Sequence, residues 1–232
     1  MRPAAVAMMT WALLAAGCVG AGSTSGASAA RLSQLTYVVQ SHRLSCEAAA
    51  LQMALTHAGI QRTQEAILQL VGVDRRPPEL AADGSVLHWG DPYDTFVGDP
   101  DGTETGLTGY GVYAPALAKA ATASGAHVLA AAQGIAAASI YDYVAHRHPV
   151  IAWVSMSGHG QYAPQPTTKY VAFDGREVIF GPGFEHSVVV VQATADQVRV
   201  YDPEPDVGPH WLSRAEFEAS YHVFGEMAVV LS

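Results

Sequence analysis

The sequence predicts an α+β fold in which helices of the N-terminal half pack on an antiparallel sheet from the C-terminal half. A helical pattern of apolar residues occupies positions 46–59. Asp174-Gly175 separates two short apolar runs, which is a strong signal for a β-hairpin. Two further apolar runs, 185–191 and 198–203, are separated by a polar turn and predict a second hairpin.

The first helix is expected to begin at a cysteine. Ser45 is a suitable N-cap, Cys46 follows at the first helical position, and Glu47 places a carboxylate in the first turn. A helix N-terminus favours a thiolate, so we expect the pKa of Cys46 to be lowered. The alternative is a small, inert cysteine buried on a core helix. The apolar stripe and the expected helix end are formed by Leu51, Leu55, Ala58 and Gly59.

The remaining elements follow from the same periodicities. Helices are expected at about 63–71, 114–123 and 139–147, and a capping box at 213–216 opens a short last helix. Strands are expected at 127–130, 149–155, 170–173, 177–180 and 227–231. Residues 83–113 form a long segment rich in Gly, Asp, Pro and aromatic residues, and such loops are often functional.

The second hairpin brings two titratable residues together. His186 opens its first strand and Asp202 closes its second, so both fall at the open end of the hairpin. A thiol at a helix start, together with an imidazole and a carboxylate at one hairpin end, is the arrangement of a nucleophilic hydrolase. Taken singly, His186 could be an ordinary strand-end histidine and Asp202-Pro203 an ordinary turn.

The motifs around these residues resemble a known family. Gln40 lies six residues before Cys46, the run SCEAAALQMAL follows, and EHSVVVV is followed by VYDP; the tract from Trp89 to Pro115 adds to the likeness. From about Thr36 onward the chain resembles the papain-like double-glycine (bacteriocin-processing) peptidases, in a stand-alone extracytoplasmic branch without a transporter domain.

The resemblance implies a papain-like cysteine peptidase fold and a role for each site residue. Cys46 would be the nucleophile, His186 the base, Asp202 the residue that orients it, and Gln40 an oxyanion-hole donor. Many relatives have glycine directly after the cysteine, whereas this chain has Glu47. A carboxylate at that position opposes thiolate formation.

Composition limits the possible partners. The chain has 232 residues, half of them hydrophobic, and a formal net charge of -9, so one domain with a sizeable core is expected over residues 31–232. No basic patch is available to meet phosphates, which excludes a nucleic-acid partner. The only lysines are Lys119 and Lys169, so binding to a membrane through a basic surface is also unsupported.

The N-terminal residues 1–30 read as an export signal followed by a flexible tether. Arg2 precedes an apolar run at 4–16 that is too short to span a membrane, which takes about 20 residues. The sequence before Cys18 resembles a lipoprotein box, and lipidation of Cys18 is favoured over cleavage at the alternative Ala27-Ser28-Ala29 site. We therefore expect an exported, cell-envelope protein, anchored at Cys18 or secreted. In either case Cys46 is left as the unmodified thiol.

The sequence offers a few other candidate sites. Trp89 and Tyr110 could line a substrate cleft, or could pack the long loop onto the body. The segment from Asp99 to Glu104 lacks the glycine of a calcium loop. No H-E-x-x-H, C-x-x-C, Walker A, G-x-G-x-x-G or G-x-S-x-G motif occurs, so neither a metal nor a cofactor is expected.

The sequence thus predicts an extracytoplasmic cysteine hydrolase that cleaves a peptide or amide bond through a thioester, with a peptide or protein as substrate. An acyltransferase or a cell-wall amidase would use the same residues. The alternative from another class is a catalytically silent binding or scaffold protein of the envelope with the same fold, which Glu47 motivates. The sequence does not indicate the oligomeric state.

Overall fold

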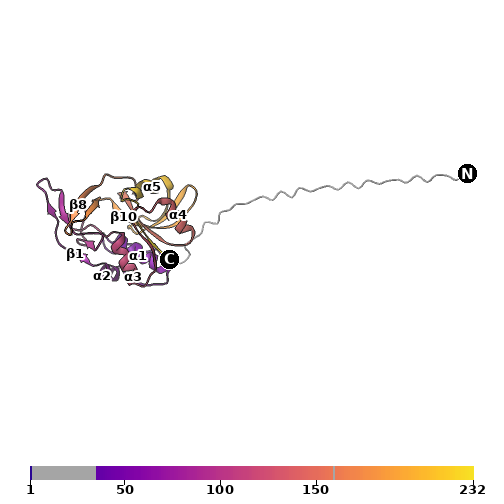
Figure 1. The fold of residues 1–232 in the computed structure, drawn as a ribbon, viewed down its shortest axis with the longest axis horizontal. Helices are drawn as coiled ribbons and strands as arrows, with labels where there is room; N and C mark the ends of the chain where they lie inside the picture. Colours follow the sequence, from indigo (N-terminus) through magenta and orange to yellow (C-terminus); the bar gives the residue numbers. More distant parts are fainter. Residues whose placement is uncertain (2–34, 159) are drawn as a thin grey trace.

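The computed structural model describes residue 1, residues 35–158 and residues 160–232 (Figure 1). The predicted signal and tether, including Cys18, fall outside the described residues apart from Met1. Within the described part, no helix is long and apolar enough to cross a membrane. The helices there are α1 (Cys46–His57), α2 (Gln64–Val71), α3 (Ala114–Ala123), α4 (Ala137–Ala145) and α5 (Arg214–His222).

An antiparallel sheet forms the centre of the molecule. Its strands lie in the order β12 (Gly208–Ser213), β11 (Gln197–Asp202), β10 (Glu185–Ala193), β6 (Val150–Ser157), β13 (Ala228–Leu231) and β5 (Val128–Ala132), and β7 (Gln161–Tyr162) pairs with the end of β6. The predicted hairpin at 185–203 is present, and a bulge between Val190 and Gln192 shifts its register. Both main neighbours of β10 are antiparallel to it, which confirms the expected α+β class.

Helices cover both faces of this sheet (Figure 1). Side chains of a strand point alternately to its two faces, and β10 follows this rule. Val189 and Val191 pack in the core that α1, α2 and α3 form, whereas Val188 and Val190 pack in a second core beneath α4 and α5. The near-continuous apolar run in β10 therefore reflects burial on both sides.

A smaller sheet lies beside the first core. It contains β2 (Glu79–Leu80), β3 (Val86–Trp89), β8 (Thr168–Ala172) and β9 (Glu177–Phe180) in that order. The predicted Asp174-Gly175 hairpin joins β8 to β9, and Gly175 has φ 96°, which suits glycine. A two-stranded parallel pair links β1 (Val73–Asp74) to β4 (Phe96–Val97). Strands β1, β2, β3, β4, β7 and β12 were not predicted.

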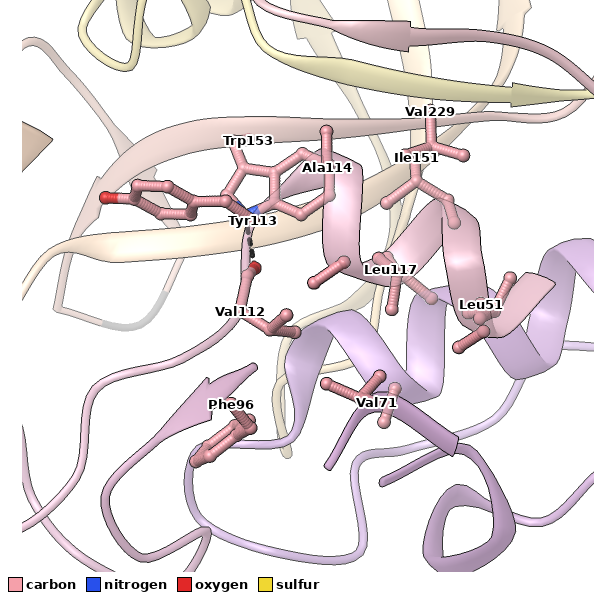
Figure 2. Packing of buried hydrophobic residues seen from close by; sticks show 14 of the residues in the cluster. Leu51, Val71, Phe96, Val112, Tyr113, Ala114, Leu117, Ile151, Trp153 and Val229 are labelled. Atoms are coloured by element: carbon pink, nitrogen blue, oxygen red, sulfur yellow. Dashed lines mark hydrogen bonds between the residues drawn. The ribbon is translucent and has the colours of Figure 1, made fainter. Parts of the chain in front are cut away.

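The first helix is more central than its sequence pattern suggested. Leu51 and Leu55 are fully buried as expected, but most other residues of α1 are buried too, and Ala58 is exposed after the helix end. The helix lies between β10, α2 and α3, so it has no solvent-facing stripe. Figure 2 shows Leu51 in this core, with Trp153 of β6 donating its indole N–H to Val112 O at 3.1 Å.

Candidate active site

Cys46 is the first residue of α1 and is buried. Ser45 holds the N-cap position, but its hydroxyl makes no cap hydrogen bond; it donates to Gln64 Oε1 at 2.9 Å and accepts from His42 N–H at 3.0 Å. The Cys46 side chain is held next to Glu47, because the thiol donates to Glu47 Oε2 at 3.3 Å. The position of the cysteine was predicted correctly, but the capping role of Ser45 was not.

The electrostatic environment of Cys46 differs from the expectation. Burial, followed by the charges of Glu47 and Glu185, holds the pKa of the Cys46 thiol well above its ordinary value, although the hydroxyl of Ser187 acts in the opposite direction. The predicted lowering of this pKa by the helix N-terminus is therefore wrong. Burial and the two nearby carboxylates destabilise the thiolate by more than the partial positive charge of a helix N-terminus stabilises it.

His186 and Asp202 form a buried pair at the open end of the hairpin. His186 Nε2 lies 2.7 Å from Asp202 Oδ1, and both side chains are almost completely buried. The other carboxylate oxygen accepts a hydrogen bond from the Tyr162 hydroxyl, and the backbone N–H of Glu204 donates to Oδ1 at 2.8 Å. Asp202 is thereby held in one orientation, and it fixes the imidazole with its Nδ1 directed away from the carboxylate.

Each member of this pair stabilises the charged form of the other. Burial alone would lower the pKa of His186, but the charge and hydrogen bond of Asp202 outweigh it, and the pKa is raised. Burial would raise the pKa of Asp202, yet His186, Tyr162 and the Glu204 N–H together lower it. His186 is thus a stronger base than an ordinary histidine, and Asp202 remains an anion.

Gln40 lies at the mouth of the site. Its backbone N–H donates to Pro203 O at 2.9 Å, which ties the loop before α1 to the end of β11. Its side-chain Nε2 donates one hydrogen to Arg43 O at 2.7 Å. An amide nitrogen carries two hydrogens, so one more is available to an acceptor in the pocket.

A pocket of about 300 Å³ joins these groups. Gln40, Cys46 and His186 line it, whereas Asp202 lies behind His186. Tyr110 is part of the lining but is only 1% exposed, and its hydroxyl is engaged with Tyr113 at 2.6 Å and with Gly181 N–H at 3.2 Å. The other lining residues are Arg43, Leu44, Thr103, Glu104, Thr105, Met156, Gly158, Gly183, Phe184, Glu185 and Glu204.

Trp89 is placed elsewhere. It is 1% exposed, its indole N–H donates to Arg76 O at 3.0 Å, and its ring packs against Tyr110, Tyr170 and Phe180. It does not line the pocket. The suggested substrate contact is therefore corrected to the alternative role, in which the ring packs the long loop onto the body.

The sequence pointed to Glu47 beside the thiol but not to two further buried carboxylates of the pocket, Glu104 and Glu185. Burial raises the pKa of Glu47 to about 7 and the pKa of Glu104 to about 8, and it raises the pKa of Glu185 well above the ordinary value. Glu104 lines the pocket and accepts a hydrogen bond from Gly183 N–H. Glu185 precedes His186 directly, and that adjacency was the available signal.

Comparison with known proteins places the chain in a family. The model of the Peptidase_C39 like family matches residues 32–229, almost the whole described part. The chain belongs to the Peptidase_C39 like family. A comparison with curated proteins gave no match. The predicted family and its papain-like fold are confirmed.

Two solved structures are similar to this chain. A C39-like peptidase from Bacillus anthracis is 23% identical, with 88% of this chain and 97% of that chain covered and a TM-score of 0.71. The peptidase domain of Streptococcus ComA, a bifunctional ABC transporter of a quorum-sensing pathway, is 16% identical; 85% of this chain and 98% of that chain are covered, with a TM-score of 0.49.

Proposed function

We propose that this Peptidase_C39 like chain is an extracytoplasmic cysteine hydrolase that cleaves a peptide or amide bond, with Cys46 as nucleophile, His186 as base and Asp202 as the residue that orients the base. The observation that carries the proposal is the buried His186–Asp202 pair at 2.7 Å, which borders the same pocket as Cys46 and Gln40. A nucleophile, a base and an oriented carboxylate at one cavity are the parts that acyl transfer requires.

The pKa directions of Cys46 and His186 support activation of the thiol by a general base. The pKa of Cys46 is raised well above its ordinary value, so a resting thiolate–imidazolium pair is disfavoured. The thiol hydrogen turns from Glu47 to His186 Nδ1, and the proton moves to the imidazole as sulfur attacks the carbonyl carbon. This is general-base catalysis, for which a histidine with a raised pKa and an ionised partner is suited.

The remaining steps use the same residues. The oxyanion accepts hydrogen bonds from the free hydrogen of Gln40 Nε2 and from the Cys46 backbone N–H. Such donors typically contribute about 3–4 kcal/mol each. The C–N bond breaks, the imidazolium gives its proton to the leaving amine, and a thioester remains on Cys46. His186 then takes a proton from water, which attacks the thioester, releases the acid and restores the thiol.

The proposal is tested with a peptide mixture. Incubation of the purified protein with a defined peptide library, followed by mass spectrometry, should show cleavage that disappears in Cys46→Ala and falls at least about 100-fold in His186→Gln. An amine acceptor added to the same reaction distinguishes acyl transfer from hydrolysis, and purified peptidoglycan tests the amidase alternative. Cleavage that persists in Cys46→Ala would contradict the assignment of the nucleophile.

A silent binding protein is the second candidate, and the thiol–Glu47 contact favours it. A hydrogen bond from the Cys46 thiol to Glu47 at 3.3 Å keeps the nucleophile neutral. The immobilised wild-type protein and immobilised Cys46→Ala are each exposed to the peptide library. If neither protein cleaves any peptide and both retain the same peptides, the chain is a binding protein and not a hydrolase.

Export and lipid anchoring complete the proposed function. The apolar run at 4–16 and the sequence before Cys18 support an envelope location. Cell fractionation should place the wild-type protein with membranes and Cys18→Ser in a soluble fraction. Equal distribution of both proteins between the fractions would contradict the anchor.

A further inference from the structure

Three potential metal ligands converge at the start of α1. Cys46 Sγ, one carboxylate oxygen of Glu47 and one of Glu185 all lie within 4.8 Å of one another, and all three residues are buried. The backbone at Gly111 packs directly against them. A Cβ atom there would lie 2.4 Å from Glu47 Oε1 and 3.1 Å from Glu185 Oε2, so glycine leaves room for the two carboxylates.

Of the two carboxylates, Glu47 has hydrogen-bond donors in the described part of the chain, and Glu185 does not have one there for each oxygen. Glu47 is satisfied by Val112 N–H at 2.7 Å and by the thiol at 3.3 Å. Glu185 is 7% exposed, yet its Oε1 has no hydrogen-bond partner among the described residues. Among the described residues, no lysine or arginine forms an ion pair with either carboxylate. A buried carboxyl group without such a partner is either protonated or paired with a cation, and a metal ion can supply that cation.

We infer that Cys46, Glu47 and Glu185 form a three-ligand binding site for Zn²⁺ that is entered from the pocket. A thiolate selects Zn²⁺ over the harder ions Mg²⁺ and Ca²⁺, and carboxylates are accepted zinc ligands. Cys46 and Glu185 line the pocket, which gives the ion a route and leaves a coordination position open to water. The ligands bind as anions, so the thiol and carboxyl protons pass to solvent when the metal enters.

Occupation of this site would have a direct consequence for the proposed hydrolase. The sulfur that attacks the substrate would be held by the metal, so Zn²⁺ would block the reaction reversibly. The proposed metal site rests on the positions of three side chains and does not require the chain to be a hydrolase. Glu185 lies far from Cys46 and Glu47 in the sequence, so no sequence motif brings the three residues together.

Cobalt titration tests the site without a substrate. Co²⁺ is added to the purified full chain, and the near-ultraviolet charge-transfer band of a thiolate–cobalt bond is recorded. The band should saturate at one equivalent and be displaced by Zn²⁺. It should be absent in Cys46→Ser, and the affinity should fall at least about tenfold in Glu185→Gln. Glu79→Gln is the control, because Glu79 is exposed and lies outside both the pocket lining and the ligand group, and should change the affinity less than about twofold.

A second readout keeps the test independent of folding defects in the variants. Zn²⁺ should slow alkylation of Cys46 in the wild-type protein at least about tenfold, and Mg²⁺ at the same concentration should not. No thiolate–cobalt band, or equal affinity in Glu185→Gln and wild type, would overturn the site. Metal binding without peptide cleavage would count against the hydrolase alone, whereas cleavage without metal binding would count against this site alone.

Discussion

Replacement of Glu47 by glutamine tests how the thiol is controlled. The carboxylate accepts the thiol hydrogen at Oε2 and the Val112 N–H at Oε1. Glutamine keeps an oxygen for Val112, and this orientation turns its NH₂ group toward Cys46. The substitution thus replaces a negative acceptor beside the sulfur with a neutral donor while preserving size.

The magnitude follows from the separation of the two groups. A full charge on Glu47 at 3.3 Å from the sulfur opposes a thiolate by about 5 kcal/mol at an effective dielectric constant of about 20, which is an upper limit. The pKa of Glu47 is about 7, so the carboxylate is largely charged above that pH and largely neutral below it. The increase in Cys46 reactivity caused by Glu47→Gln should therefore be greatest above pH 7 and smaller in more acidic solution.

The assay is the rate of Cys46 alkylation by iodoacetamide between pH 6 and 9. Glu47→Gln should react at least about tenfold faster than wild type at pH 8, which corresponds to about 1.4 kcal/mol. Glu104→Gln is the control, since Glu104 has no hydrogen bond to the thiol, and should remain close to wild type. Equal rates for Glu47→Gln and wild type across this range would refute the inhibitory role of Glu47.

Three further predictions concern stability. The pKa of Glu104 is raised from 4.5 to about 8, so the wild-type protein loses stability as pH rises from 4.5 to 8 and the buried carboxyl group ionises. Glu104→Gln cannot ionise, so its free energy of unfolding in urea should rise relative to wild type by up to about 5 kcal/mol between these pH values. Glu79→Gln, at an exposed glutamate, should show no such change. Tyr162→Phe removes the hydroxyl that donates to Asp202 and should lower the free energy of unfolding by about 1–3 kcal/mol. The pKa of Asp202 should rise in this variant, so the variant should lose stability at a higher pH than wild type on acidification, and acid unfolding of both proteins at the same pH would contradict this. Leu55→Ala opens a cavity in the fully buried core and should cost about 2–5 kcal/mol by the same measurement, and a loss below 1 kcal/mol would contradict the packing.

The sequence was sufficient for elements that follow local rules. The stop at Gly59, the Thr63 start of α2, the Asp174-Gly175 turn and the capping box at Ser213 all depend on backbone preferences of nearby residues, and each is present. Placement of His186 beside Asp202 also followed, because a hairpin couples residues close in sequence.

Features set by distant packing could not be predicted in the same way. Trp89 is a core residue because three rings from other segments surround it, and nothing local distinguishes it from a cleft-lining tryptophan. The pKa of Cys46 is raised by burial and by Glu185, which lies far along the chain. Local sequence indicated the helix end at the cysteine and the opposing carboxylate of Glu47, but not the burial of the thiol or the second carboxylate, Glu185.

Acylation of Cys46 tests the central claim most directly. The protein is mixed with p-nitrophenyl acetate, and the acetyl group on Cys46 is followed over time by mass spectrometry, which needs no knowledge of the natural substrate. His186→Gln should slow acylation at least about 100-fold, and His222→Gln, at an exposed histidine, should leave the rate unchanged. An acylation rate that is the same in His186→Gln and wild type would contradict the assignment of Cys46 and His186 to one catalytic site.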